Sequence, residues 1–131
     1  MIIQIVLLLG VAALIMIYTT IKGKHITGGT QPPSTKSIIN SYLDNTPVVI
    51  FSKSKCPYCY RSKTLFKKMG VSFIALELDK MKNGKDIQTT LYQMTNQRTV
   101  PNIFINGEHI GGNDDAQRKV SDGTLQKLLN L

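Results

Sequence analysis

Cys56 and Cys59 are the residues of this sequence best suited to chemistry, because they are its only thiols and form one Cys-X-X-Cys pair. Such a pair can be a dithiol redox centre, half of a metal site, or a short structural disulfide. A four-ligand zinc site needs two more ligands, and the only histidines are His25, in a Gly/Pro-rich stretch, and His109, beside an Asn-Gly turn. A disulfide across so short a loop would remove little chain entropy. The pattern therefore favours redox chemistry, and no metal is expected.

The residues around the pair predict that its two sulfurs differ. If a helix begins at Pro57, Cys56 is its N-cap, and the sulfur faces the free amides of Tyr58 and Cys59 and the positive end of the helix dipole. Together with Lys53, these groups should lower the pKa of Cys56 from about 8.5 into the range of roughly 3.5 to 7.5. Cys59, in the first turn, should remain a thiol. Because a low-pKa thiolate also leaves faster from a mixed disulfide, the pattern favours thiol–disulfide exchange through Cys56.

The elements on either side place this pair at the edge of a sheet. Residues 48–51 form a continuous apolar run that predicts a strand covered on both faces. The cysteines follow at its carboxyl end, where open α/β sheets keep their sites. Apolar residues then recur at helical spacing up to Gly70. Residues 71–78 predict a second strand, parallel to the first because a helix crosses between them.

The rest of the domain reads as four further helices and one hairpin. The expected signals are Ser37 as cap and Pro47 as end of a first helix, Asn83 with Asp86 as a capping pair, a hairpin turning at Asn106-Gly107, a short helix opened by Asp114 and Asp115, and a last helix capped by Ser121 or Asp122. These elements, alternating along the chain, predict an α/β domain.

The first part of the chain has a different character. Residues 1–21 contain an apolar run that matches the thickness of a bilayer core and predict a single transmembrane anchor rather than a cleaved signal peptide. Residues 22–35 read as a flexible linker, and residues 36–131 as the domain. Lys22 and Lys24 follow the apolar run and place the domain in the cytosol, the alternative being a lumenal domain in the secretory pathway.

The charge of the chain is concentrated near the cysteines. The net charge is +8, and the six basic residues between Asp44 and Glu77 have no acidic residue among them. Such a field attracts anions and favours thiolate over thiol, although a solvated helix face accounts for most of these cations equally well. The chain has no Trp and no zinc-finger or RNA-binding signature, so nucleic acid is not an expected partner.

The order of motifs resembles a glutaredoxin of the dithiol, CPYC type over residues 36–131. A strand, CPYC and a helix are followed by a strand and a helix, then Thr99-Val100-Pro101, a hairpin, Gly111-Gly112 and an acidic pair. The resemblance implies a thioredoxin-like fold, with a four-stranded mixed sheet flanked by helices. It also implies a glutathione-dependent thiol–disulfide oxidoreductase that reduces glutathione mixed disulfides and protein disulfides. Thioredoxins typically carry WCGPC instead, and this chain has no Trp.

The resemblance also assigns roles to individual residues. Cys56 would take up the glutathionyl group and Cys59 would resolve the mixed disulfide. The implied glutathione contacts are Lys53, Gln88 and Arg98 at the glycine-end carboxylate, Tyr58 beside the sulfur, Thr99, Val100 and Pro101 along the cysteinyl unit with a cis Val100–Pro101 bond, and Gly112, Asp114 and Asp115 at the γ-glutamyl end. Asn113 departs from the pattern, because relatives often carry another cysteine there. Without the resemblance, Gln88 and Arg98 would read as ordinary exposed residues and Asp115 as a helix cap.

Two other functions compete with this one. Cys56 thiolates and glutathione from two copies could hold an iron–sulfur cluster, although the Pro-Tyr linker and the second cysteine speak against it. A thioredoxin-like oxidoreductase that does not use glutathione is the other alternative. The expected partners are glutathione, glutathionylated or disulfide-bonded proteins and a membrane, and the expected state is a monomer.

Overall fold

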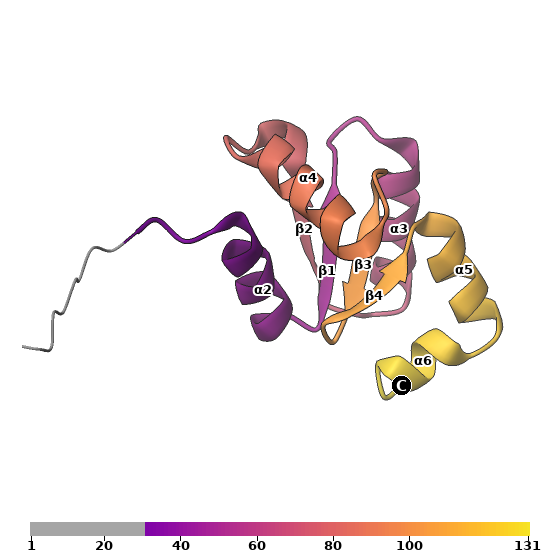
Figure 1. Cartoon of the computed structure of the whole chain (residues 1–131). Helices are drawn as coiled ribbons and strands as arrows, with labels where there is room; N and C mark the ends of the chain where they lie inside the picture. The colour runs from indigo at the N-terminus through magenta and orange to yellow at the C-terminus, as the bar shows by residue number, and fades with distance from the viewer. Residues whose placement is uncertain (1–30) are drawn as a thin grey trace, which may run out of the picture. The chain divides into compact units, whose positions relative to one another are not determined.

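The computed structural model describes residues 31–131 (Figure 1). The expected transmembrane anchor, residues 1–21, and most of the expected linker, residues 22–35, lie outside the described residues. Among the helices of residues 31–131, none combines the length and the apolar character that a membrane crossing requires. The described part of the chain is an α/β domain, as the sequence predicts.

A four-stranded mixed sheet in the order β2-β1-β3-β4 forms the centre of the domain. Strand β1 (Val48–Ser52) pairs in parallel with β2 (Ile74–Glu77) and antiparallel with β3 (Asn102–Ile105). Strand β4 (Glu108–Gly111) pairs antiparallel with β3 at the edge. This confirms the expected mixed sheet, the parallel pairing of the first two strands and the hairpin.

Helices cover both faces of the sheet (Figure 1). They are α2 (Thr35–Asn45), α3 (Pro57–Lys68), the short 3₁₀ helix η1 (Leu78–Lys80), α4 (Gly84–Thr95), α5 (Asn113–Ser121) and α6 (Thr124–Leu128). Helices α3, α5 and α6 supply core residues on one face, and α2 and α4 supply them on the other. The elements that carry the site therefore lie in a three-layered domain with a core on each side of the sheet.

Strand β1 contributes to both cores because successive side chains of a strand point to opposite faces. Val48 and Ile50 pack in the core that includes Phe66 of α3. Val49 and Phe51 pack in the opposite core. All five of these side chains are fully buried. The apolar run of the sequence is thus a central strand covered on both faces, and the residues just beyond it are held in a fixed position.

Helix α2 begins one turn earlier than the sequence predicts. The expected cap was Ser37, but Ser34 is the N-cap, and its side-chain oxygen accepts a hydrogen bond from the backbone N–H of Ser37 at 3.2 Å. The backbone of Ser34 is extended and follows Pro32 and Pro33, which favour extended chain. The helix starts where this proline segment ends.

The other two predicted caps are also corrected. Asn83 is the N-cap of α4 but makes no side-chain cap hydrogen bond, so it does not form the expected pair with Asp86. The start of α4 is instead defined by packing, because a Cβ at Gly84 would lie 1.8 Å from the Leu78 carbonyl oxygen. The N-cap residue of α6 is Gly123 rather than Ser121 or Asp122, although the Asp122 Oδ1 accepts from the Thr124 backbone N–H at 2.9 Å.

Candidate active site

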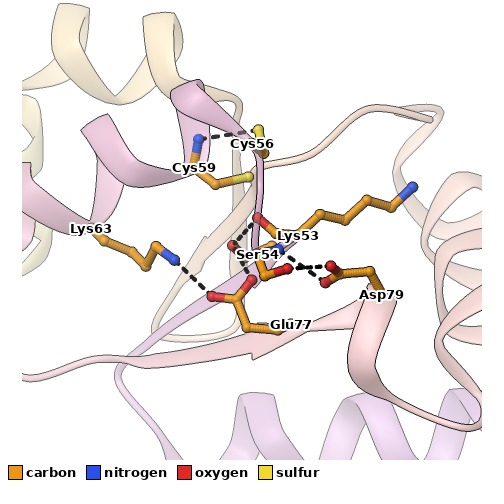
Figure 2. Close-up of polar contacts among 8 residues, drawn as sticks. Lys53, Ser54, Cys56, Cys59, Lys63, Glu77 and Asp79 are labelled. Atoms are coloured by element: carbon orange, nitrogen blue, oxygen red, sulfur yellow. Dashed lines mark hydrogen bonds and ion pairs between the residues drawn. The ribbon is translucent and has the colours of Figure 1, made fainter.

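Cys56 lies where β1 has ended and α3 begins. It is the N-cap of α3, Pro57 is the first helical residue, and the Cys56 backbone is extended. The backbone N–H of Cys59 donates to the Cys56 Sγ at 3.3 Å (Figure 2). This geometry confirms the helix-start interpretation of the sequence. A negative charge on this sulfur would be stabilised by the helix amides and the helix dipole.

The two cysteines have different environments. Both are free thiols; Cys56 is half-buried and Cys59 has no exposed surface. Burial, with a hydrogen bond to Cys56 as the next cause, raises the pKa of Cys59 from 9.0 to about 11. The expectation that Cys59 stays a thiol at neutral pH is thereby supported. Only Cys56 offers its sulfur to a reactant in solution.

The segment before β3 closes the site from the other side. The Cys56 thiol donates to the Val100 carbonyl oxygen at 3.7 Å, across 44 residues of sequence. The Val100–Pro101 peptide bond is cis, as the resemblance implies. Tyr58 is 53% exposed beside this junction, and the Arg61 guanidinium lies 5.3 Å from the centre of its ring. Two distant parts of the chain therefore meet at the reactive sulfur.

A groove of about 460 Å³ brings most of the expected glutathione contacts together. It is lined by Tyr58, Gln97, Thr99, Val100, Pro101, Gly112, Asn113, Asp114 and Asp115. Seven of these nine were predicted contacts, and Gln97 and Asn113 were not. The groove runs from the start of α3 along the cis-proline segment to the start of α5.

The two acidic residues of α5 are in different situations. The Gly112 backbone N–H donates to the Asp115 Oδ2 at 2.9 Å, and the other Asp115 oxygen pairs with Arg118. Asp115 thus caps the start of α5, as its sequence position alone suggests, and its side chain is already engaged before any ligand binds. Among the hydrogen bonds of the described residues, the Asp114 side chain takes part in one: its Oδ1 accepts from the side-chain Nδ2 of its neighbour Asn113 at 3.2 Å. Asp114 is the carboxylate that remains available to a positively charged ligand group.

Gln88 and Arg98 come together in a second hollow, of about 640 Å³, along α4. The Gln88 Nε2 donates to the Arg98 carbonyl oxygen at 2.8 Å. The Arg98 guanidinium lies 4.0 Å from the centre of the Tyr92 ring, which holds its plane in place. Arg98 directly precedes Thr99, a residue of the 460 Å³ groove.

Lys53 is the predicted contact that the structure does not bring to the others. It lines neither hollow, and its side chain extends away from both cysteine sulfurs (Figure 2). The expectation that its amine acts directly on Cys56 is therefore not met in this structure. The physical reason is that Lys53 follows a buried strand, and its long side chain points from the strand end towards solvent.

Gln97 is a residue that sequence reasoning missed. Its Nε2 donates to the carbonyl oxygens of Thr99 at 3.0 Å and of Pro101 at 2.9 Å. These bonds brace the cis-proline segment from within one loop. Both acceptors are main-chain groups, so no residue type in the sequence signals the contact.

Asn113 links helix α3 to helix α5. The sequence marks this residue only as a departure from the family pattern. Its side chain is 6% exposed, and its Oδ1 accepts from the buried Ser62 hydroxyl of α3 at 3.1 Å. Its Nδ2 donates to Asp114. The Ser62–Asn113 bond therefore ties the helix that carries the cysteines to the helix that begins at the groove.

The sheet, the cysteine pair and the cis proline together define the class of protein to which this chain belongs. A mixed sheet whose central strand leads into Cys-X-X-Cys at a helix start, with a cis proline opposite the first sulfur, is a thioredoxin-like fold with a thiol–disulfide exchange site. The glutaredoxin family model matches residues 48–110. The chain belongs to the glutaredoxin family.

Individual relatives and solved structures agree with this. Glutaredoxin-C6 of Oryza sativa is 51% identical over 85 residues, which cover 65% of this chain and 76% of the relative. Glutaredoxin-2 of Schizosaccharomyces pombe is 44% identical over 94 residues, covering 72% and 86%. A crystal structure of a buckwheat glutaredoxin–glutathione complex has a TM-score of 0.72 at 41% identity, covering 76% of this chain and 94% of that one. This chain is accordingly a glutathione-dependent thiol–disulfide oxidoreductase with glutathione as co-substrate.

The Ser62–Asn113 bond yields a first prediction. Replacing Ser62 or Asn113 with Ala should each cost about 1–3 kcal/mol of unfolding free energy, because each change leaves a buried partner unsatisfied. The double variant should cost less than the sum, by about 0.5–3 kcal/mol. Urea unfolding of the four proteins measures this. Ser121→Ala is a matched control, because Ser121 bonds only within its own exposed helix turn; additive costs would contradict a direct bond between Ser62 and Asn113.

The difference between the two thiols yields a second prediction. Limiting iodoacetamide at neutral pH should alkylate Cys56 and spare Cys59, as read by mass spectrometry of peptides. Burial disfavours the thiolate, so labelling of Cys59 should rise only as the pH approaches its pKa of about 11. In urea both thiols should react alike. Equal labelling of the two cysteines in the folded protein at neutral pH would show that this assignment is wrong.

Proposed function

We propose that this protein is a dithiol glutaredoxin in which Cys56 is the nucleophile and Cys59 the resolving thiol. The observation that carries the proposal is the position of the Cys56 sulfur. It lies at the N-terminus of α3, accepts the Cys59 amide and adjoins the groove at Val100, whereas Cys59 is buried behind it. A reactant approaching along the groove meets Cys56 first.

The reaction follows from this arrangement. The Cys56 thiolate attacks the glutathionyl sulfur of a mixed disulfide, the old S–S bond breaks, and the substrate leaves as a thiolate. Attack by a second glutathione thiolate on the glutathionyl sulfur then restores the Cys56 thiolate and yields glutathione disulfide. With a protein disulfide as substrate, Cys59 attacks the Cys56 sulfur and the substrate's second thiol is released. The helix start stabilises the Cys56 thiolate each time it departs.

The groove supports glutathione as the ligand of this site. Its Thr99–Pro101 side offers main-chain groups to the cysteinyl unit, and Gly112 and Asp114 lie at the start of α5, where free amides and one carboxylate fit an α-amino acid end. Gln88 and Arg98 would take the glycine-end carboxylate. Lys53 remains a proposed contact for the same carboxylate, although it lines neither hollow in this structure. In this proposal, Asp115 acts through the backbone at Gly112 rather than by direct contact.

Activity on a small mixed disulfide tests the roles of the cysteines. Cys56→Ser should abolish reduction of hydroxyethyl disulfide coupled to glutathione reductase, because the remaining cysteine, Cys59, has no exposed surface. Cys59→Ser should retain this activity but lose protein-disulfide reduction, which needs the resolving thiol. Thermal unfolding of both variants verifies that they fold. Normal turnover by Cys56→Ser would overturn the proposal, and turnover with thioredoxin reductase but none with glutathione would support the competing oxidoreductase.

We further propose that residues 1–21 anchor the enzyme to a membrane, with 22–35 as linker and 36–131 as a monomeric domain in the cytosol. The support is the length of the apolar run and the lysines after it. The full chain should stay with membranes after alkaline carbonate extraction, whereas a chain beginning at residue 31 should be released. Protease added to sealed, cytosolic-side-out vesicles should digest the domain. Release of the full chain by carbonate would exclude an anchor, and protection would place the domain in the lumen.

A further inference from the structure

A carboxylate holds the loop between β1 and α3. Asp79 accepts a hydrogen bond from the backbone N–H of Ser54 at 2.9 Å and a second one from the Ser54 hydroxyl (Figure 2). Among the hydrogen bonds of the described residues, these two are the ones that join residues 53–55 to a distant segment of the chain. Ser54 and Lys55 are exposed, so little packing holds them. The conformation of this loop therefore depends on Asp79.

The two bonds continue the pairing of β1 with β2 beyond the ends of the strands. Ser52 and Glu77, the last residues of the two strands, are register partners in the parallel pair, and the Ser52 hydroxyl donates to the Glu77 Oε2 at 2.9 Å. Ser54 and Asp79 lie two residues further along each segment and keep the same offset of 25 residues. A side chain thus replaces the main-chain ladder at the point where the chain turns away from the sheet.

Asp79 is itself held in place. It belongs to the 3₁₀ helix η1 and directly follows Leu78, which is buried in the core that α2 and α4 form with the sheet. The start of α4 packs on the Leu78 carbonyl at Gly84, where no Cβ would fit. The bond from the Ser54 hydroxyl, and after it the bond from the Ser54 backbone, lower the pKa of Asp79 below its usual value. At neutral pH the loop is therefore attached to an ionised carboxylate on a packed element.

The loop leads directly to the reactive sulfur. The Cys56 backbone N–H donates to the Lys53 carbonyl oxygen at 3.1 Å, which closes a four-residue turn with Ser54 as its second residue. Cys56 is both the last residue of this turn and the N-cap of α3, and its Sγ accepts a backbone N–H of the first helical turn at 3.3 Å. Because Asp79 fixes the turn, it also fixes the position from which Cys56 enters the helix.

We propose that Asp79 is a positioning residue that holds the Cys56 sulfur against the start of α3 by fixing the turn at Ser54. This inference rests on the proposed role of Cys56 as the thiol that takes up the glutathionyl group. A thiolate held against free helix amides is stabilised and leaves a mixed disulfide readily. When the turn is released, the sulfur spends less time in that position, and the thiolate loses part of its stabilisation. Asp79 thereby favours the free Cys56 thiolate over its mixed disulfide.

The equilibrium between Cys56 and glutathione disulfide measures this effect. The Cys56 thiolate attacks one sulfur of glutathione disulfide, a Cys56–glutathione S–S bond forms, the original S–S bond breaks, and one glutathione leaves as a thiolate. A less stable Cys56 thiolate moves this equilibrium towards the mixed disulfide. The experiment uses the full chain carrying Cys59→Ser, which avoids the second exchange step. Mass spectrometry gives the glutathionylated fraction of Cys56 at neutral pH and at a series of fixed ratios of reduced to oxidised glutathione.

Asp79→Ala should raise the equilibrium constant for glutathionylation of Cys56 about fivefold, the factor that corresponds to the net contribution of one hydrogen bond. Asp79→Asn should stay within about twofold of the native value, because an amide oxygen still accepts from the Ser54 backbone without carrying a charge. Ser54→Ala removes the hydroxyl bond and keeps the backbone bond, so it should give an intermediate value.

Asp122→Ala is the matched control. The Asp122 Oδ1 accepts from the Thr124 backbone N–H at 2.9 Å, so this exposed carboxylate also holds a backbone amide, but it does so between α5 and α6. Its replacement should lower the thermal stability about as much as Asp79→Ala does. The equilibrium constant for glutathionylation of Cys56 should stay at the native value.

Each outcome has a distinct meaning. An unchanged equilibrium constant in Asp79→Ala overturns the positioning role, whatever the loss of stability. A decrease of the constant in both Asp79→Ala and Asp79→Asn also overturns it, because that result shows that the carboxylate acts on the thiolate through its charge alone. An equal increase in Asp122→Ala overturns it as well, because the effect would then follow from general destabilisation. A Cys56 that takes up no glutathionyl group in the chain with native Asp79 would instead refute the proposed function itself.

Discussion

The junction between β1 and α3 is the constraint on which the rest of the site depends. Strand β1 is buried on both faces and fixes the point where the chain leaves the sheet. Four residues later Cys56 caps α3, and its sulfur accepts the Cys59 amide. A buried strand on one side and a helix start on the other leave this sulfur little freedom. A sulfur held against unpaired helix amides is a good leaving group, which thiol–disulfide exchange requires.

The same junction makes the two cysteines unequal. The first turn of α3 directs Cys59 into the interior, where it has no exposed surface, while the Cys56 thiol contacts Val100, a residue of the groove. The short spacing of Cys-X-X-Cys thus creates two environments within one helical turn. One thiol is open to reactants, and the other lies in the interior behind it.

Polar contacts far apart in sequence hold the walls of the groove. Gln97 braces the cis-proline segment through two main-chain carbonyls, and Ser62 with Asn113 joins α3 to α5. The family pattern often has a cysteine where this chain has Asn113. An asparagine at this position removes a thiol and supplies a hydrogen bond to each of two neighbours. The departure is therefore compatible with the site and adds a link that a thiol would make only weakly.

The sequence alone determined the order of elements, the central strand, the N-cap at Cys56 and the hairpin turn. These features depend on local patterns, namely an apolar run, a proline at the first helical position and an Asn-Gly pair. Asn106 and Gly107 both have positive φ, as such a hairpin turn requires. The motif order also indicated most of the groove, because the cysteines, Thr99-Val100-Pro101 and the acidic pair occur in the family's sequence.

Only the tertiary structure decided which of these residues act together. It turned Lys53 away from the sulfurs, used Asp115 as a cap and brought Gln97 to the cis-proline segment. It also placed Ser52, Glu77 and Lys63 in one network, although 25 residues separate Ser52 from Glu77. Side-chain direction and contacts between distant segments depend on how helices pack on the sheet. A pattern read along the chain does not contain that information, whereas helix and turn signals are local and can be read directly.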